Sequence, residues 1–287
     1  GSEDPSKTVI DCAGNANWYG VYIGQNALFH GFMITNGSTV ESTGGSIIAI
    51  GSAVVSNCVV QGGSGGVRLT GNAVFTDGVI SNLFIRSDKS VALSMSSARL
   101  YNSRLANLTG QWNKSALMTD GSTIISNCVI CNTKSANNSI DISGTTLIAD
   151  CLITNNNATT SSSYAYMGHG GIYSKGSLTM ERCKLIGNYS SRIGAIGNTD
   201  GTVVIKDCLI VGNYTTRSYL TGGIYATAAA TTTIRNCTIV SNKTLAASTA
   251  GGVYAASANC KITDCLIWDN VYQGTDAETG ATVLTRK

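Results

Sequence analysis

A pattern of about 26 residues, repeated from one end of the chain to the other, constrains the fold more than any other feature. The pattern becomes visible when the chain is aligned on one position per repeat. The aligned positions are Gly31, Cys58, Leu83, Ser103, Cys128, Cys151, Cys183, Cys208, Cys237 and Cys265. A period of this length is typical of solenoids, in which each repeat packs only against its neighbours.

Residues at fixed offsets from the aligned position share the same chemistry. The residues three positions earlier and two positions later are apolar in all ten repeats, as Ile205 and Ile239 illustrate. The residue one position earlier is Asn or Asp in eight of the ten repeats, and Asn recurs five positions later in six of them. Apolar residues between turn-forming residues indicate short strands. We therefore expect two buried strands that meet at an Asn or Asp corner in every coil.

The composition also favours short strands and tight turns over helices. Apolar residues make up 43% of the chain and charged residues only 12%, with 33 glycines and one proline. We predict an all-β fold, a right-handed single-stranded parallel β-helix (solenoid) of about ten coils of about 26 residues. Residues 1–287 are interpreted as one domain of a larger protein, with an added linker at 1–7 and a terminal coil or exit segment at 271–287.

Two columns of identical residues are expected along the solenoid. Asparagine tolerates left-handed backbone geometry, and amides stacked in successive coils can bond to one another as an asparagine ladder. Six cysteines share one register position, and we interpret them as a ladder of small, buried, reduced side chains. The pair Cys128 and Cys131 has C-x-x-C spacing, but no second pair or nearby His completes a metal site. No metal and no cofactor are predicted.

The repeat units resemble a known group of proteins. Gly-Gly-Ile-Tyr at 170–173 and 222–225 alternates with segments such as Asn-Cys-Thr-Ile-Val-Ser-Asn at 236–242. These units resemble the right-handed parallel β-helix repeats of bacterial surface proteins, of the polymorphic membrane protein type with GGA-I and FxxN repeats, and pectate-lyase-like β-helices. The resemblance implies a β-helix that is secreted or displayed on a bacterial surface. It does not select a function, because enzymes, adhesins and passive stalks share this architecture.

Charge and motif content exclude several function classes. The net charge of +3 comes without a dense Lys or Arg cluster, so nucleic acid is not an expected partner. No apolar run approaches the roughly 20 residues of a membrane span. The acidic residues are scattered among turns and there are two histidines, so no catalytic residues are predicted. The sequence favours an adhesin-like binding module that contacts carbohydrate or a protein partner along one face. A β-helix polysaccharide lyase or glycoside hydrolase and a passive stalk stay open as alternatives.

A candidate ligand site lies where the spacing between aligned cysteines is longest, between Cys151 and Cys183. Insertions in solenoids form loops on one face, and such loops commonly carry binding. The predicted ligand-binding residues are Tyr164, Tyr166, His169, Tyr173 and Tyr225. Gly197 shares a column with the last two, so a notch with aromatic walls is expected there. Tyrosines folded back on the rod, or ordinary surface stacking, would explain the same residues without a ligand.

A second candidate surface is an apolar stripe at positions expected to point outward. The predicted interface residues are Phe32, Ile34, Phe84, Leu152, Leu209, Leu266 and Trp268. Such a stripe exceeds the scattered exposed apolar residues of a typical monomer. The strand propensity of these residues, a covering segment outside this sequence, or an interface with another copy or a partner would each account for it. Trp268 would anchor an interface.

Overall fold

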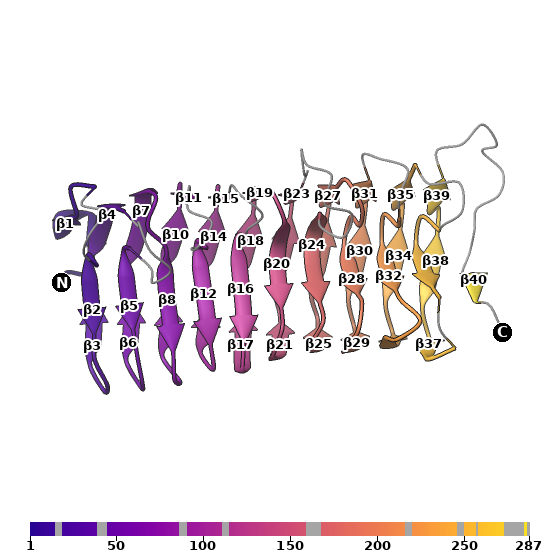
Figure 1. Ribbon diagram of the computed structural model, residues 1–287, viewed down its shortest axis with the longest axis horizontal. Helices are drawn as coiled ribbons and strands as arrows, with labels where there is room; N and C mark the ends of the chain where they lie inside the picture. The colour runs from indigo at the N-terminus through magenta and orange to yellow at the C-terminus, as the bar shows by residue number, and fades with distance from the viewer. Residues whose placement is uncertain are drawn as a thin grey trace.

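The computed structural model describes residues 1–14, 19–38, 45–85, 91–110, 115–158, 168–215, 220–245, 250–256, 258–272 and 284–285. The chain forms a rod of stacked coils, with β1 at one end and β38 at the other (Figure 1). All strand pairs are parallel and each strand pairs with its equivalents in the neighbouring coils. One short 3₁₀ helix, η1 (Pro5–Lys7), precedes the first strand. No helix in these ranges is long and apolar enough to cross a membrane.

Two of the four sheets meet at the corner where the candidate site lies. Sheet 1 contains eleven strands, β1 (Val9–Asp11), β4 (Met33–Gly37), β7 (Val59–Gly63), β10 (Val79–Ser81), β14 (Arg104–Ala106), β18 (Val129–Cys131), β22 (Leu152–Thr154), β26 (Lys184–Ile186), β30 (Leu209–Val211), β34 (Thr238–Val240) and β38 (Leu266–Trp268). Sheet 2 contains eight, β11 (Phe84–Ile85), β15 (Thr109–Gly110), β19 (Lys134–Ser135), β23 (Asn157–Ala158), β27 (Tyr189–Ser190), β31 (Tyr214–Thr215), β35 (Lys243–Thr244) and β39 (Val271–Tyr272).

The other two sheets complete each coil. Sheet 3 contains β2 (Val21–Ile23), β5 (Ile47–Ala49), β8 (Val67–Thr70), β12 (Leu93–Ser96), β16 (Leu117–Asp120), β20 (Asn138–Ile142), β24 (His169–Ser174), β28 (Ile196–Asn198), β32 (Ile224–Ala226), β36 (Val253–Ala255) and β40 (Leu284–Thr285). Sheet 4 contains β3 (Leu28–His30), β6 (Val54–Ser56), β9 (Val74–Thr76), β13 (Arg99–Tyr101), β17 (Ser122–Ser126), β21 (Thr145–Ala149), β25 (Ser177–Glu181), β29 (Thr202–Lys206), β33 (Thr231–Arg235) and β37 (Cys260–Thr263).

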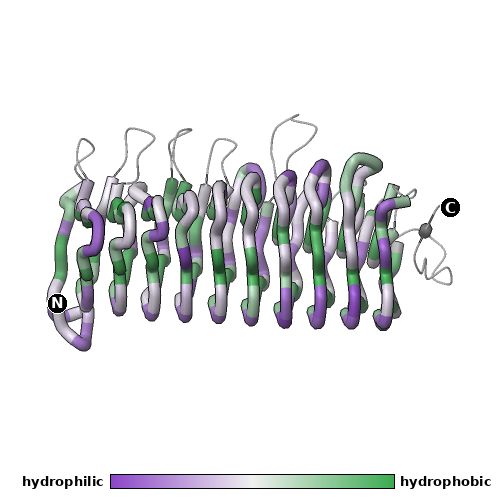
Figure 2. Tube along the Cα trace, turned by 90° about the horizontal axis from the view of Figure 1, so that it is seen from below, coloured by the Kyte–Doolittle hydropathy of each residue, from purple (hydrophilic) through white to green (hydrophobic). Residues whose placement is uncertain are grey.

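One continuous apolar core runs inside the rod, because each strand directs alternate side chains inward. Ile205 and Ile239, taken from the two invariably apolar offsets, are both 0% exposed. Hydrophobic and hydrophilic residues recur at matching places in successive coils (Figure 2). Coils differ in length, because the segments between strands vary while the paired strands keep their register. The parallel β-solenoid expected from the repeat is confirmed.

The expected register is wrong in the first and third coils. Met33 pairs with Val59 and Ile34 with Val60, so Phe32, not Gly31, is equivalent to Cys58. Gly31 is the left-handed corner, with φ 72°. The first coil has apolar residues at both candidate offsets, so the pattern could not separate the two registers. As a consequence Leu28, expected to be buried, is 69% exposed.

In the third coil the equivalent of Cys58 is Gly78, not Leu83. Val79 pairs with Val59 and Ile80 with Val60, which places Leu83 further along, at the start of sheet 2. Ile80 and Ile85 both point inward, so they match the apolar template around Leu83 although they belong to different sheets. A glycine at the true position leaves no side-chain signal in the sequence.

An asparagine ladder runs along the inside of the rod. Asn156, Asn188, Asn213 and Asn242 each donate through Nδ2 to Oδ1 of the next asparagine, at 2.8 to 2.9 Å, and the ladder reaches Asn270. These residues are at most 4% exposed. A second, exposed set of amides bonds at the corner before sheet 1, as Asn127 does to Asn102 at 3.0 Å. Both sets satisfy polar groups at corners where the strand ladder stops.

Candidate functional site

A groove follows the corner between sheet 1 and sheet 2 across successive coils. Its volume is about 610 Å³, which falls within the roughly 300 to 1,000 Å³ of small-molecule sites. It is lined by Asn107, Thr109, Asn132, Thr133, Lys134, Asn155, Asn157 and Tyr189. All of these side chains carry polar groups, and none of these described lining residues is Asp or Glu. We call this site the corner groove.

Three asparagines form the corner itself. Asn107, Asn132 and Asn155 have φ values of 56°, 55° and 54°, a left-handed conformation that Asn adopts more readily than most residues. Each follows the aligned position of its coil by four residues, and each is exposed to solvent. The short turn therefore presents one side-chain amide per coil to the groove.

The other wall is the outward column of sheet 2. Thr109, Lys134, Asn157 and Tyr189 are equivalent residues of successive coils. Asn157 Nδ2 donates to the Tyr189 hydroxyl oxygen at 2.8 Å. The Tyr189 ring stacks on Tyr214, with centroids 5.0 Å apart and an interplanar angle of 3°. These two contacts hold the tyrosine ring at the end of the groove.

Two residues of the lining carry a buried side-chain oxygen without a hydrogen-bond partner in the described ranges: Thr133 Oγ1 and Asn157 Oδ1. Both are shielded from bulk solvent, and Thr133 is 1% exposed. Thr133 stands where later coils carry the ladder asparagine, and its backbone N–H donates to Asn156 Oδ1 at 3.0 Å. Neither oxygen has exposed surface, so the groups that the groove offers to a ligand are the exposed corner amides, Lys134 and the Tyr189 ring.

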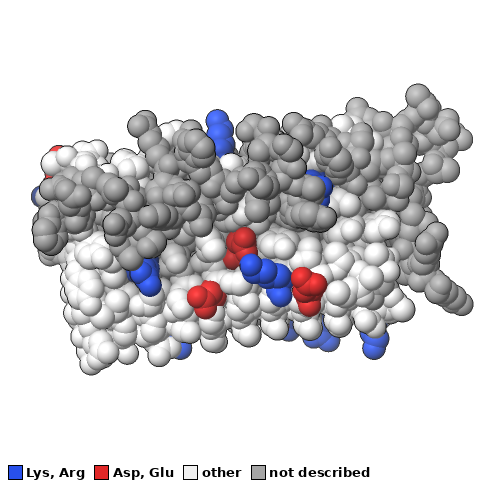
Figure 3. All heavy atoms as spheres, viewed as in Figure 1, with Lys and Arg blue, Asp and Glu red and all other residues white. Residues whose placement is uncertain are grey.

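The charge of the groove comes from one side chain. Lys134 is exposed and is the one charged residue among the described lining residues. Burial raises the pKa of Tyr214, and the neighbouring Tyr189 adds to that effect, so the Tyr214 phenol stays neutral at physiological pH. Charged side chains are also sparse on the face of the rod seen in Figure 3. The groove offers amides, hydroxyls, an aromatic ring and a single cation.

The predicted ligand site around the insert lies only partly within the described residues. Tyr164 and Tyr166 lie outside the described residues. Tyr173 and Tyr225 do flank Gly197 in one column of sheet 3, as register pairing shows. The expected notch at Gly197 is filled, however, because the His169 imidazole occupies it: a Cβ on Gly197 would lie 2.5 Å from His169 Cδ2. The notch prediction is wrong for this packing reason.

His169 is a buried structural residue, 3% exposed. Nδ1 lies 2.6 Å from Asn138 Oδ1, and Asn138 Nδ2 in turn donates to Asp141 Oδ2 at 3.1 Å. Since the amide oxygen only accepts, Nδ1 carries the proton. Burial, and secondarily the charge of Arg192, lower the pKa of His169 to about 3, so the imidazole is neutral. Its ring packs 4.6 Å from Tyr173. The expectation that His169 reaches a ligand is therefore not supported.

The predicted apolar stripe does not form one continuous outward surface. Ile34 is 0% exposed and belongs to the core, which corrects its predicted outward position. Phe32 packs partly against the core and stacks on Phe29, with ring centroids 4.4 Å apart. It does so because the register of the first coil differs by one residue from the expected register. Phe84 is 36% exposed but belongs to sheet 2.

The remaining stripe residues do lie on the outer face of sheet 1. Leu152 and Leu209 are half-buried and are separated by Lys184 in the same column. Leu266 is 59% exposed and Trp268 is 72% exposed, and both belong to β38, the last strand of the sheet. Val9 of β1, at the other end of the same sheet, is 52% exposed, so the most exposed apolar side chains of this face lie in its two end strands. An interface role for these residues stays a prediction.

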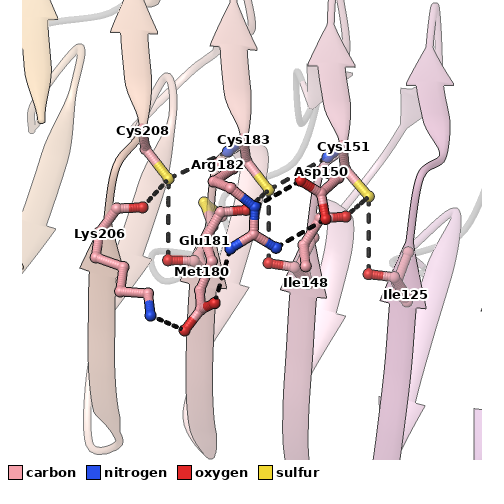
Figure 4. Close-up of polar contacts among 11 residues, drawn as sticks. Ile125, Ile148, Asp150, Cys151, Met180, Glu181, Arg182, Cys183, Lys206 and Cys208 are labelled. Carbon is pink, nitrogen blue, oxygen red and sulfur yellow. Dashed lines mark hydrogen bonds and ion pairs between the residues drawn. The ribbon is translucent and has the colours of Figure 1, made fainter.

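A group of charges lies beside the cysteine column, at the corner before sheet 1 (Figure 4). Arg182 takes the left-handed corner position, with φ 51°, and its guanidinium binds both oxygens of Asp150 at 2.7 and 2.8 Å. Glu181 bridges Arg182 and Lys206, at 3.1 and 2.6 Å. Hydrogen bonding to Arg182 lowers the pKa of Asp150. These side chains are all partly exposed, and their ion pairs link three neighbouring coils.

No group of three or more His, Cys, Asp or Glu side chains that could hold a metal ion occurs in the described parts of the chain. All ten cysteines are free thiols.

Comparison with known proteins decides the family. The model of the right-handed β-helix region matches residues 91–286, more than half of the chain. The chain belongs to the right-handed β-helix family. No curated protein matches its sequence. Among solved structures, this β-helix is similar to the catalytic unit of a thermostable GH87 α-1,3-glucanase from Streptomyces thermodiastaticus strain HF3-3. The identity is 15% and the TM-score is 0.23, over 90% of this chain and 62% of that chain.

The corner groove of the β-helix was not found by sequence reasoning, although a signal was present. Asn107, Asn132 and Asn155 recur once per coil, each at the fourth position after the aligned one. That recurrence marks a second corner in each coil. The recurrence is incomplete in the sequence, because the glycines Gly62, Gly187 and Gly212 take the same left-handed position in other coils.

Proposed function

We propose that this β-helix is a secreted or surface-exposed binding module that holds a carbohydrate in the corner groove. The observation that carries the proposal is the column of exposed corner amides, Asn107, Asn132 and Asn155, in a groove lined throughout by polar side chains. A glycan is dense in hydroxyl groups, which would pair with these amides in one coil after another.

The aromatic end of the groove supports the same ligand class. Tyr189 is half-buried and held in place by Asn157 and Tyr214. A fixed aromatic ring beside hydrogen-bonding groups suits a sugar, which has an apolar ring face and polar edges. Equivalent groups repeat at the coil spacing of about 4.8 Å, so an extended chain of sugar units would meet similar contacts along the rod.

Binding is favoured over cleavage by the composition of the lining. Glycosidases act through two carboxyl groups that flank the scissile bond, and general acid–base catalysis needs titratable groups within hydrogen-bond reach of the reacting atoms. The described lining residues include no carboxylate. A lyase or hydrolase would need a different site, and a passive stalk would leave the groove without a ligand.

A glycan array followed by calorimetry on the bound glycans tests the proposal. Asn132→Gly removes one corner amide and keeps the left-handed turn, and Tyr189→Ala removes the aromatic ring. We expect each variant to lose about tenfold in affinity, equivalent to about 1.4 kcal/mol. Tyr254→Ala is the matched control, because Tyr254 stacks on Tyr225 in sheet 3, away from the groove.

Three outcomes would contradict the proposal. Absence of binding to any glycan would favour the passive stalk. Full affinity in both groove variants would move the site elsewhere on the rod. Release of reducing sugar or unsaturated product from a bound glycan would assign an enzyme.

A further inference from the structure

A second pocket lies on the same corner of the rod as the corner groove, closer to the N-terminal end. Its volume is about 440 Å³, and it is lined by Ala13, Gly14, Asn36, Gly37, Ser38, Gly63 and Ser64. We call it the N-terminal pocket. It spans the ends of β1, β4 and β7, whereas the corner groove begins after β14, so one coil, that of β10, lies between them. This corner runs along the edge of the rod that β7, β11, β15 and β19 mark in Figure 1.

One column of left-handed corner residues joins the two pockets. Thr35 pairs with Gln61 and Gln61 with Ser81, and the same register continues along sheet 1, so the residues that follow the paired ones are equivalent. This corner column consists of Asn36, Gly62, Asn82, Asn107, Asn132 and Asn155, with φ values from 54° to 68°. Its five asparagines are all exposed. The amides of the proposed glycan site therefore extend beyond the corner groove into the N-terminal pocket.

The outward column of sheet 2 also continues from one pocket to the other. The hydroxyl oxygens of Ser38 and Ser64, in neighbouring coils, are 3.4 Å apart. Ser64 and Phe84 each stand three residues after a paired residue of sheet 1, and Phe84 in turn pairs with Thr109 of the corner groove. An aromatic ring that is 36% exposed thus lies between hydroxyl groups on either side. This arrangement suits a sugar, which has an apolar ring face and polar edges.

Hydrogen bonds orient the corner amides and leave part of each amide available. Asn107 Nδ2 donates to Asn82 Oδ1 and Asn36 Nδ2 donates to Asp11 Oδ1, both at 3.0 Å. A primary amide has two N–H donors and two acceptor lone pairs, so further donors and acceptors can pair with glycan hydroxyls. Gly62 is the one position of the corner column without an amide. The nearest atom to a Cβ placed there is Asn36 Oδ1, at 3.6 Å, so the space for a side chain is open.

We propose that the N-terminal pocket and the corner groove are two parts of one site, which binds a single linear glycan laid along the rod axis. This inference rests on the proposed function and adds the length and direction of the ligand. From the coil of β1 to the coil of β26 there are seven coil steps, or about 34 Å at about 4.8 Å each. A chain long enough to reach both pockets gains contacts in each without a second association step, so affinity should grow with chain length.

The test uses neutral linear gluco-, xylo-, manno- and galacto-oligosaccharides of two to ten sugar units, titrated calorimetrically into the full chain. The series that binds should rise in affinity until the oligosaccharide spans about 34 Å, and it should end at least about tenfold above the trisaccharide. One oligosaccharide should bind per protein. Affinity that is independent of length, or two oligosaccharides bound per protein, would overturn this inference and leave the proposed function standing. Absence of binding in every series would overturn the inference, and the glycan array then decides whether the proposed function falls with it.

Two glycine variants separate the shared site from a general effect of an added amide. Gly62→Asn supplies the missing amide at a left-handed position that Asn adopts readily. It should raise the affinity for the longest oligosaccharide about two- to tenfold, the effect of one hydrogen bond, and leave the trisaccharide unchanged. Gly212→Asn is the matched control, because Gly212 has the same corner geometry, with φ 64° and no atom within 4 Å of a Cβ, and lies beyond the Tyr189 end of the groove. Equal effects of the two variants would contradict the shared site.

A third variant removes the aromatic ring between the pockets. Phe84→Ser should lower the affinity for the longest oligosaccharide about tenfold, equivalent to about 1.4 kcal/mol, with the trisaccharide unaffected. Leu28→Ser, at a 69% exposed apolar position of sheet 4, is its control and should bind every length like the wild type. Circular dichroism checks that both variants fold. Unchanged affinity of folded Phe84→Ser for the longest oligosaccharide would show that the chain does not cross from one pocket to the other.

Discussion

The imidazole of His169 fills the space that Gly197 leaves by having no side chain. The two residues are in neighbouring coils of sheet 3, and a Cβ on Gly197 would approach His169 Cδ2 to 2.5 Å and Nε2 to 2.8 Å. The histidine enters this space because Asn138 orients the ring from the other side, through its bond to Nδ1. The column of tyrosines alone would leave a gap at Gly197, and the imidazole fills that gap.

Substitution of this glycine should destabilise the fold. Gly197→Ala forces the imidazole out of its position, and overpacking of this kind costs about 1 to 3 kcal/mol. Urea unfolding measures the loss. Gly24→Ala is the matched control, since a Cβ there has no atom within 4 Å, and its stability should change by less than about 0.5 kcal/mol. Equal stability of the two variants would show that the ring does not occupy the space.

His169 should make stability depend on pH in the acidic range. Its pKa is lowered to about 3 in the folded protein by burial and by Arg192, against about 6.5 in an unfolded chain. Between these values the unfolded state binds the additional proton, so stability is complete above about pH 6.5 and falls as the pH drops toward 3.

The variant His169→Gln isolates this dependence, because its amide still donates to Asn138 but does not titrate. Melting temperatures between pH 4 and 7.5 should fall less steeply for this variant than for the wild type. An identical slope for this variant and the wild type would contradict the buried neutral imidazole.

The inner asparagine ladder should contribute more to stability than the exposed amides at the corners. Asn213→Ala removes the partner of Asn188 and of Asn242 inside the rod, and leaves several buried polar groups unpaired. Each such group costs about 1 to 3 kcal/mol, so we expect a loss of at least about 3 kcal/mol. Asn236→Gly, at an exposed left-handed corner, should lose less than about 1 kcal/mol. Denaturant titration compares the two, and similar losses would argue against the ladder.

The exposed end of sheet 1 should promote self-association. Leu266 and Trp268 lie on the same face of β38 at 59% and 72% exposure, and large apolar side chains of this kind anchor interfaces. Sedimentation velocity over a concentration series should show weak association that Trp268→Ser abolishes. Tyr22→Ser, at a 59% exposed aromatic of β2 near the other end, is the control and should associate like the wild type. A monomer at every concentration would remove this interface.

Much of the architecture could be predicted from the sequence alone, because the structural repeat of a solenoid appears as a period in its sequence. The inward positions exemplified by Ile205 and Ile239, the cysteine column and the shared column of Tyr173 and Tyr225 all follow from fixed offsets. In such a fold, residues one period apart are neighbours, so linear spacing is also spatial spacing.

The tertiary structure alone decided the features that depend on side-chain packing between coils. Whether the position of Gly197 is open or filled depends on the direction of the His169 ring, which no periodic pattern encodes. The corner groove likewise depends on where Thr133 and Tyr189 lie relative to a turn, and the first-coil register depends on the corner geometry of Gly31. Periodicity determines which face a residue occupies, whereas rotamers and left-handed turns determine what that face presents to a ligand.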